Sequence, residues 1–70
     1  MSLQLEEIQP GWTVVGADGQ EIGTVTDVEP DGIHVKKGGL LGGQTVVPRD
    51  SVVEIETGRI ELNRTKSDLG

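Results

Sequence analysis

A tight turn that feeds an irregular strand, at residues 16–28 (GADGQEIGTVTDV), constrains the fold more than any other stretch of the chain. Asp18-Gly19 is a strong hairpin signal, because a type I′ turn needs positive φ at both central residues and these residue types tolerate it well. Two strands should therefore leave this turn side by side, and the rest of the chain has to supply their partners.

The second strand of that hairpin, residues 21–28, has an odd apolar spacing. Ile22, Val25 and Val28 are its most apolar members, whereas a regular strand places residues of one parity on each face. Gly23 offers a remedy, because a glycine inside a strand often marks a bulge or bend that shifts the register. We therefore predict a bend at Gly23 that turns Val25 inward and curls the strand, as a small closed barrel requires.

Short runs with alternating polarity, separated by turn signals, predict the remaining strands. Pro30-Asp31-Gly32 predicts a turn in which proline sets φ and Gly32 takes the left-handed position. Thr57-Gly58 predicts another tight turn, and residues 49–51 a turn or short 3₁₀ segment. The expected strands are residues 12–15, 21–28, 33–36, 45–47, 53–56 and 59–63, with Ile33, Val35, Val53, Ile55, Ile60 and Leu62 facing the core.

Composition limits the core and the classes of site. Seventy residues allow one domain, and Trp12 is the only aromatic residue, so the core has to be aliphatic. The chain has no cysteine, which excludes disulfides and thiolate metal sites. Self-association is one way in which so small a domain can bury more apolar area, and we expect a homo-oligomer.

The net charge and the hydropathy of the chain limit the kinds of partner that it is expected to bind. The net charge is −6, and three lysines and three arginines spread along the chain form no basic stripe, so direct binding of nucleic acid is not expected. No segment approaches the roughly 20 apolar residues of a membrane-spanning helix, and the N-terminus has no signal-peptide pattern. We expect a cytoplasmic protein.

Residues suited to catalysis or metal binding are few. His34 is the one residue of a type suited to proton transfer near neutral pH, but it lies on the outer side of an alternating strand with no evident acid or base partner. Asp18, Asp27 and Asp31 lie near turns, where aspartate commonly binds its own backbone, and their spacing does not match a calcium loop. We therefore predict no catalytic residues, no metal and no cofactor.

A glycine-rich loop at residues 36–44 is the strongest candidate for contact with another molecule. Lys36 and Lys37 precede it and are placed to meet an anion, although the loop lacks the order of a phosphate-binding loop. Leu40 and Leu41 are flanked by glycines, so they either fold over the barrel mouth or face a partner. The sequence leaves these two alternatives open.

Two patterns in the chain resemble the PRC-barrel domains, which are named after the photosynthetic reaction centre H subunit. Residues 16–28 resemble the family signature, and Val46-Val47-Pro48, Gly58 and Ile60-Glu61-Leu62 resemble the second half of its fold. The resemblance covers about residues 11–63, and residues 36–43 are similar to a short stand-alone bacterial subgroup of unknown function. It implies an all-β fold, a small antiparallel PRC-type, SH3-like barrel of five to six short strands.

This resemblance, together with the residues, sets the organisation and function that we expect. Residues 1–10 form an N-terminal arm, residues 11–63 the barrel-like domain and residues 64–70 a frayed tail. Asp18, Gly19, Gly23, Asp31, Gly32 and Gly58 shape turns and bends. The function implied is non-enzymatic contact with a protein partner or self-assembly. Two alternatives are a small-molecule or anion-binding domain that uses residues 36–44, and a ribosome-associated accessory factor.

Overall fold

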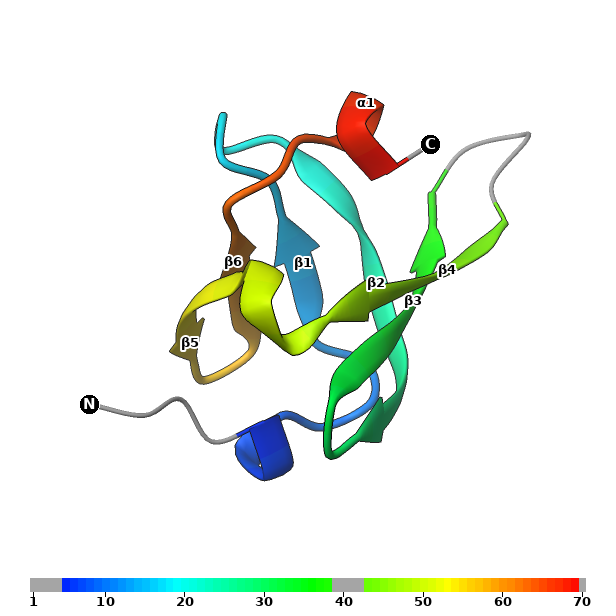
Figure 1. Ribbon diagram of the computed structural model, residues 1–70, viewed down its shortest axis with the longest axis vertical. Coiled ribbons are helices and arrows are strands. Elements are labelled where there is room, and N and C mark those ends of the chain that lie inside the picture. The colour runs from blue at the N-terminus through cyan, green and yellow to red at the C-terminus, as the bar shows by residue number, and fades with distance from the viewer. Residues whose placement is uncertain (1–4, 39–42, 70) are drawn as a thin grey trace.

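Six strands in one sheet curl around an aliphatic core (Figure 1), which confirms the all-β class. The computed structural model describes residues 5–38 and 43–69. The strands are β1 (Thr13–Val15), β2 (Glu21–Glu29), β3 (Gly32–Lys37), β4 (Gln44–Pro48), β5 (Val52–Glu56) and β6 (Arg59–Leu62). The helical segments are the 3₁₀ turns η1 (Leu5–Glu7) and η2 (Arg49–Ser51) and the single turn α1 (Lys66–Leu69).

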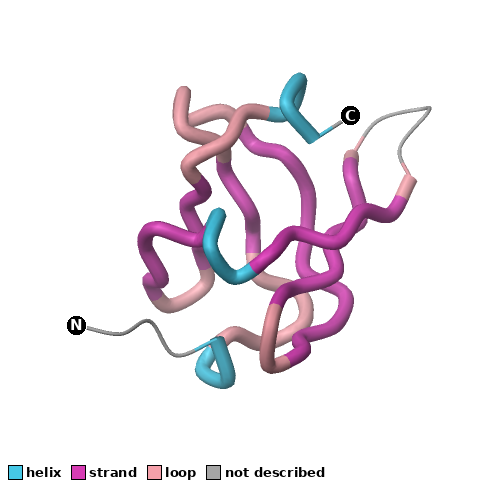
Figure 2. The backbone as a smooth tube through the Cα atoms, viewed as in Figure 1, coloured by secondary structure: helices cyan, strands magenta, loops and turns pink. Residues whose placement is uncertain are grey.

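The sheet is mixed and open, which corrects the prediction of an antiparallel closed barrel. Its strand order is β4-β3-β2-β1-β6-β5, so β4 and β5 are the edges, and η2 joins them at a corner (Figure 2). All neighbours are antiparallel except β1 and β6, which run parallel. Alternation of polarity predicts which face of the sheet a residue occupies, but it does not predict whether two paired strands run parallel or antiparallel. The parallel pair could therefore not be predicted from the sequence.

The irregular spacing in β2 comes from two bulges rather than one. The first lies opposite β1, where Val14 pairs with Gly23 but Val15 pairs with Glu21, which leaves Ile22 as the extra residue. Both Ile22 and its glycine neighbour are buried as a result. A bulge places two residues against one and so changes which parity faces the core.

The second bulge of β2 lies opposite β3 and was not predicted. Val25 pairs with Val35 and Asp27 pairs with His34, so Thr26 is the extra residue. Thr26 and Asp27 are consequently both exposed, and the valine that follows them returns to the core side. The two bulges together turn the apolar residues at positions 22, 25 and 28 inward.

The turn before β2 differs from the predicted type I′ geometry. Gly19 has φ of +82°, but no residue other than glycine has positive φ among those that the structure describes, so Asp18 is not left-handed. Asp18 instead accepts a hydrogen bond from the backbone N–H of Gln20 at 3.1 Å, and the Gly19 N–H donates to the carbonyl of Gly16 at 2.9 Å. This is a longer loop in which glycine alone takes the left-handed conformation. Gly58, with φ of +86°, does the same in the turn between β5 and β6.

Gly32 does not occupy the left-handed turn position that was predicted for it. Its φ is not positive, and it is the first residue of β3, paired with Glu29 and Pro48. A Cβ atom at this position would lie 2.6 Å from the carbonyl oxygen of Val47. Gly32 is therefore suited to the close approach of β4, while Pro30-Asp31 forms the turn.

The core is built from aliphatic side chains of all six strands and the N-terminal segment. Leu5 and Ile8 are 4% and 3% exposed and close one end of the core beside β2, so the predicted arm packs into the domain. Trp12 is half-buried against this cluster. The buried core residues are Leu5, Ile8, Val14, Val15, Ile22, Val25, Ile33, Val35, Val47, Val52, Ile60 and Leu62.

Edge strand β5 differs from the predicted alternation at its first apolar pair. Val52 pairs with Leu62 and Glu54 pairs with Glu61, so Val53 is the extra residue of a third bulge. Val52 is buried and Val53 is 47% exposed, which reverses the assignment of Val53 to the core.

The C-terminal segment, predicted to be frayed, contains α1 with a reciprocal cap. The Thr65 N–H donates to Asp68 Oδ2 at 2.9 Å, and the Asp68 N–H donates to the Thr65 hydroxyl oxygen at 3.3 Å. The backbone N–H of Thr65, followed by its hydroxyl, lowers the pKa of the Asp68 carboxyl. This arrangement is a capping box, whose sequence signature Thr-x-x-Asp is present in the chain.

Candidate functional site

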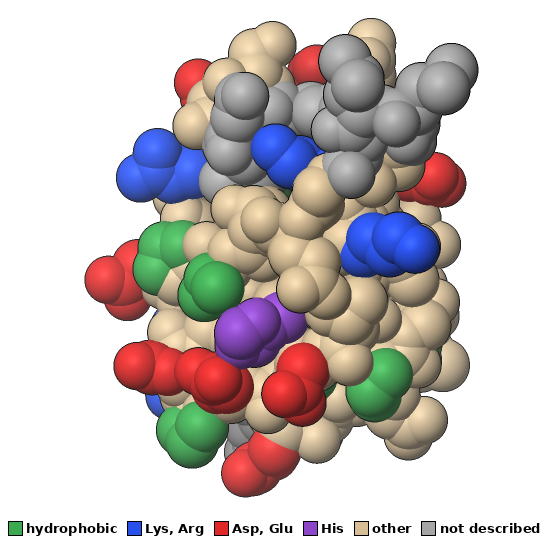
Figure 3. All heavy atoms as spheres, turned by 90° about the vertical axis from the view of Figure 1, so that its right-hand side faces the viewer, with side chains coloured by type: hydrophobic (Ala, Val, Ile, Leu, Met, Phe, Trp, Pro, Cys, Tyr) green, Lys and Arg blue, Asp and Glu red, His purple; other side chains and the backbone are tan. Residues whose placement is uncertain are grey.

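The outer surface of β2, β3 and β4 gathers a histidine, carboxylates, a lysine and an exposed valine on one side of the sheet. Figure 3 shows this side, with the histidine between acidic side chains and hydrophobic ones next to it. Most of these side chains share the solvent side because their neighbours along each strand face the core, and the second bulge of β2 exposes two adjacent residues there. We call this surface the β2–β4 face, and its residues are Thr24, Thr26, Asp27, Glu29, His34, Lys36, Gln44 and Val46.

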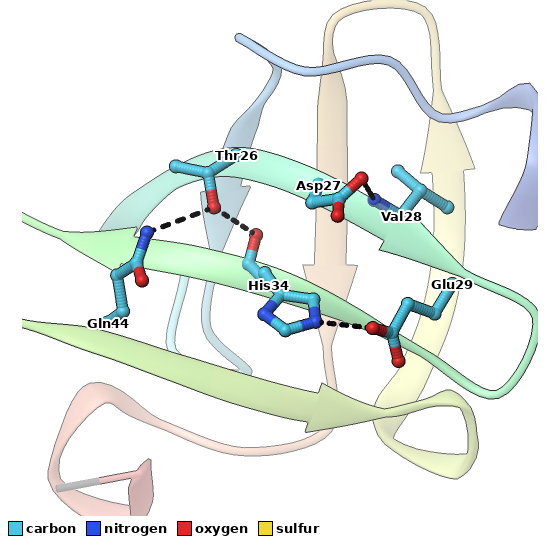
Figure 4. A network of polar contacts seen from close by, with 6 residues as sticks. All are labelled: Thr26, Asp27, Val28, Glu29, His34 and Gln44. Atoms are coloured by element: carbon cyan, nitrogen blue, oxygen red, sulfur yellow. Dashed lines mark hydrogen bonds and ion pairs between the residues drawn. The ribbon is translucent and has the colours of Figure 1, made fainter.

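A polar network crosses this face at the second bulge of β2 (Figure 4). The Thr26 hydroxyl donates to the backbone carbonyl of His34 at 3.3 Å, and Gln44 Nε2 donates to the Thr26 hydroxyl oxygen at 3.5 Å. Asp27 Oδ1 accepts a hydrogen bond from the N–H of Val28 at 2.9 Å, just after the bulge. The network therefore links β2, β3 and β4 on their outer side and fixes the bulge.

His34 has a carboxylate partner that the sequence did not reveal. Its Nε2 lies 2.9 Å from Glu29 Oε1, and the two side chains are 30% and 50% exposed. The pairing arises because the hairpin turn after Glu29 returns β3 alongside β2. The nearby Thr26 hydroxyl is directed to the His34 carbonyl rather than to its imidazole. The pair therefore does not activate that hydroxyl as a nucleophile.

Charge is distributed unevenly along β3. Glu29 and Asp31 lie at the hairpin that begins the strand, whereas Lys36 and Lys37 lie at its end. The face therefore has an acidic end and a basic end, separated by His34. Such separation favours partners whose charges are arranged in the opposite sense.

Edge strand β4 borders the face and carries an exposed aliphatic side chain. Val46 is 56% exposed and lies directly opposite His34 in the β3–β4 register. β4 contains no charged residue, and its last residue is Pro48. Native edge strands usually carry charges, bulges or prolines that discourage pairing with another chain. β4 has only its short length and Pro48 in this role.

A second polar cluster lies on β5 and β6 around Arg59. Arg59 is 3.7 Å from Glu56 and 3.9 Å from Glu61, and these residues line a shallow hollow together with Glu54. The arginine offsets part of the acidic charge that the alternating sequence placed there. Within residues 5–38 and 43–69, no group of three or more histidine and acidic residues is arranged to hold a metal ion. No helix in that same part of the chain could cross a membrane.

The predicted interaction loop is only partly visible. Lys36 is exposed and Lys37 is half-buried at the end of β3, where the Lys37 N–H donates to the carbonyl of Gly43 at 2.8 Å. Leu40 and Leu41 lie outside the described residues.

Sequence reasoning missed Val46 and Thr26. The run Thr45-Val46-Val47 was identified as a strand, but a stretch with two adjacent valines does not reveal which one faces out. Pro48 was the available signal, because proline within a sheet is confined largely to edge strands and strand ends. The role of Thr26 as the extra residue of a bulge follows only from the register of β2 against β3.

The profile of a family described as an uncharacterized protein conserved in bacteria (DUF2171) matches residues 8–69, which include all six strands and α1. A comparison with curated proteins gave no match.

Proposed function

The chain belongs to this bacterial family, and we propose that it is a non-enzymatic β module that works by binding a protein, through its sheet edges and the β2–β4 face. One observation carries the proposal. Of the large hydrophobic side chains that the structure describes, two are exposed, and each lies on one of the two edge strands. Val46 is on β4 and Val53 is on β5.

Edge strands are suited to such contact because one side of their backbone has no partner within the sheet. An added strand gains main-chain hydrogen bonds, while exposed side chains beside it supply apolar contact. Val46 meets both conditions, since β4 pairs only with β3 and is uncharged. Val53 meets them less well, because it sits in a bulge followed by Glu54. We therefore place the main contact at β4.

The chemistry of the face also favours binding over catalysis. A catalytic site needs a reactive group held beside a base and a cavity that excludes water. His34 and Glu29 are partly exposed, and the Thr26 hydroxyl donates to the backbone carbonyl of His34. A surface of this kind is suited to recognising another surface.

We also propose that the sheet is a variant of the PRC-barrel fold and that the protein acts in the cytoplasm. The signature residues 16–28 form the turn and most of β2, and η2 stands at the corner between the edge strands. Only the three residues of η2 separate β4 from β5 along the chain, and the two edge strands are not hydrogen-bonded to each other. An experimental structure with the sheet flat rather than curled would remove this kinship.

Co-purification from native bacterial extract tests the function. The tagged chain, a Val46→Lys variant and a Thr57→Lys control that adds the same charge in an exposed turn would be compared by mass spectrometry. We expect proteins that the parent chain and the control retain and that Val46→Lys loses. Two results would contradict a contact at β4 if the chain is also monomeric. One is equal retention by all three proteins, and the other is retention no higher than that of the tag alone.

The anion-binding alternative is checked in the same preparation. Lys36 and Lys37 are consecutive residues at the end of β3, next to the glycine-rich loop, and Lys36 lies on the β2–β4 face. Binding of phosphate or a nucleotide would raise the melting temperature by mass action. A rise that Lys36→Ala and Lys37→Ala abolish would favour this alternative over protein contact.

A further inference from the structure

We propose that β4 pairs with β4 of a second copy of this chain, antiparallel about a two-fold axis at Val46. The inference rests on the proposed function and names the partner of that surface. The result is an isologous dimer, in which the same strand contributes from both sides. Its sheet runs continuously through β2, β3 and β4 of one copy into β4, β3 and β2 of the other.

Two hydrogen bonds at the ends of the β3–β4 ladder establish which backbone groups face outward. The Lys37 N–H donates to the Gly43 carbonyl at 2.8 Å, and the Arg49 N–H donates to the Asp31 carbonyl at 2.9 Å. Hydrogen-bonded and non-hydrogen-bonded pairs alternate along an antiparallel ladder. Positions 45 and 47 of β4 therefore bond to β3, while positions 44, 46 and 48 direct their backbone groups away from it.

The outward N–H and carbonyl groups of β4 in one copy can pair with the same groups in a second copy. Gln44, Val46 and Pro48 are all exposed, and the first two offer both an N–H and a carbonyl. With Val46 opposite Val46 of the second copy, these two residues exchange two hydrogen bonds. Gln44 of each copy then donates to the carbonyl of Pro48 of the other, which makes four bonds about the axis. Pro48 has no N–H to offer, so the pairing ends there.

Side chains select this register over its neighbours. Directly opposite side chains on one face of an antiparallel pair are in contact, and apolar pairs there are stabilising. The register centred on Val46 places this exposed side chain against the same side chain of the second copy. A shift by two residues would place Val46 opposite Gln44 or Pro48 of the second copy instead, and would lose the valine–valine contact.

Charge supports a second copy as the occupant. β4 itself is uncharged, so no like charges meet across the axis. Antiparallel pairing directs the basic end of each β2–β4 face, at Lys36, toward the acidic end of the other, at Glu29. β5 lacks this complementarity, because its self-pairing would bring Glu54 and Glu56 of two copies together.

Sedimentation velocity on the full chain, from micromolar to millimolar concentration, tests the proposal. We expect a concentration-dependent dimer, and we expect Val46→Lys to weaken it at least about tenfold by placing two ammonium groups face to face. Val46→Pro should weaken it similarly, because it removes an outward N–H and leaves the β3–β4 ladder intact. Val53→Lys on the other edge is the matched control and should dimerise as the parent chain does.

Amide hydrogen exchange supplies a readout that is independent of the variants. Protection of the Gln44 and Val46 amides should rise with protein concentration, whereas protection of Thr57 should not. A chain that stays monomeric throughout, or a dimer with unchanged exchange at these amides, would overturn the proposal. A monomer that still captures a protein from extract in a Val46-dependent manner would overturn self-pairing alone and leave the proposed contact function standing.

Discussion

The carbonyl oxygen of Lys36 occupies the space that a Cβ atom on Gly23 would need. A Cβ built on Gly23 would also lie 2.8 Å from the Lys36 carbonyl carbon and 2.9 Å from Lys37 Cα. The φ of Gly23 is not positive, so the requirement for glycine comes from the close approach of β3 and not from backbone strain. The bulge at Ile22 and this approach together allow β2 to bend between β1 and β3.

Gly23→Ala should lower the free energy of unfolding by about 1–3 kcal/mol, because an added methyl group has to push β3 away from β2. Chemical denaturation monitored by far-UV circular dichroism measures the change. Gly38→Ala is the matched control, since a Cβ there would meet nothing within 4 Å and φ is not positive. Equal effects of the two substitutions would contradict the close-approach argument.

Gly58→Ala should cost about 1–2 kcal/mol for a different reason. Its φ of +86° is left-handed, where an L side chain is strained even though a Cβ at Gly58 has open space around it. Gly58→Asn should cost less than the alanine variant, because asparagine tolerates this region better. Thermal and urea unfolding of both variants compare them, and an alanine variant as stable as the parent would show that the turn relaxes.

Ser51→Ala should destabilise the protein by about 1 kcal/mol, the typical net value of one hydrogen bond. Ser51 is 2% exposed, and its hydroxyl oxygen accepts a hydrogen bond from Arg64 Nε at 3.0 Å. This bond ties η2 to the segment after β6. Ser67→Ala, an exposed serine in α1, is the control and should change stability little. Urea titration of the two variants gives the comparison, and a neutral Ser51→Ala would mean that the bond contributes nothing.

The cap of α1 should open as the pH falls. The Thr65 N–H and hydroxyl lower the pKa of Asp68 in the folded chain, so the ionised form favours the cap. The cap is therefore fully present above the ordinary aspartate pKa of about 4 and is lost as the pH falls through the lower folded-state value. The NMR shifts of the Thr65 amide and the Asp68 carboxyl carbon should titrate together in the parent chain. In Asp68→Asn the Thr65 amide should not follow this titration.

The candidate site shows where sequence reasoning succeeds and where it stops. The alternation of Ile33, His34 and Val35 placed the histidine on the outer face, where it lies. Its partner Glu29 could not be predicted, because the contact depends on how the hairpin returns and on the bulge at Thr26. Val46 was missed because the strand it occupies became an edge only through the order of the sheet.

Local chemistry determined the strands and most turns of this protein from its sequence. Glycine and aspartate at Asp18-Gly19 and Gly58 mark chain reversals, and apolar alternation marks the core side of β3 and β6. Only the tertiary structure decided the parallel pairing of β1 with β6, the bulges in β2 and β5, and the open edge at β4. The reason is physical: alternation and turn preference act over a few residues, whereas register and strand order follow from how distant segments fill one shared core.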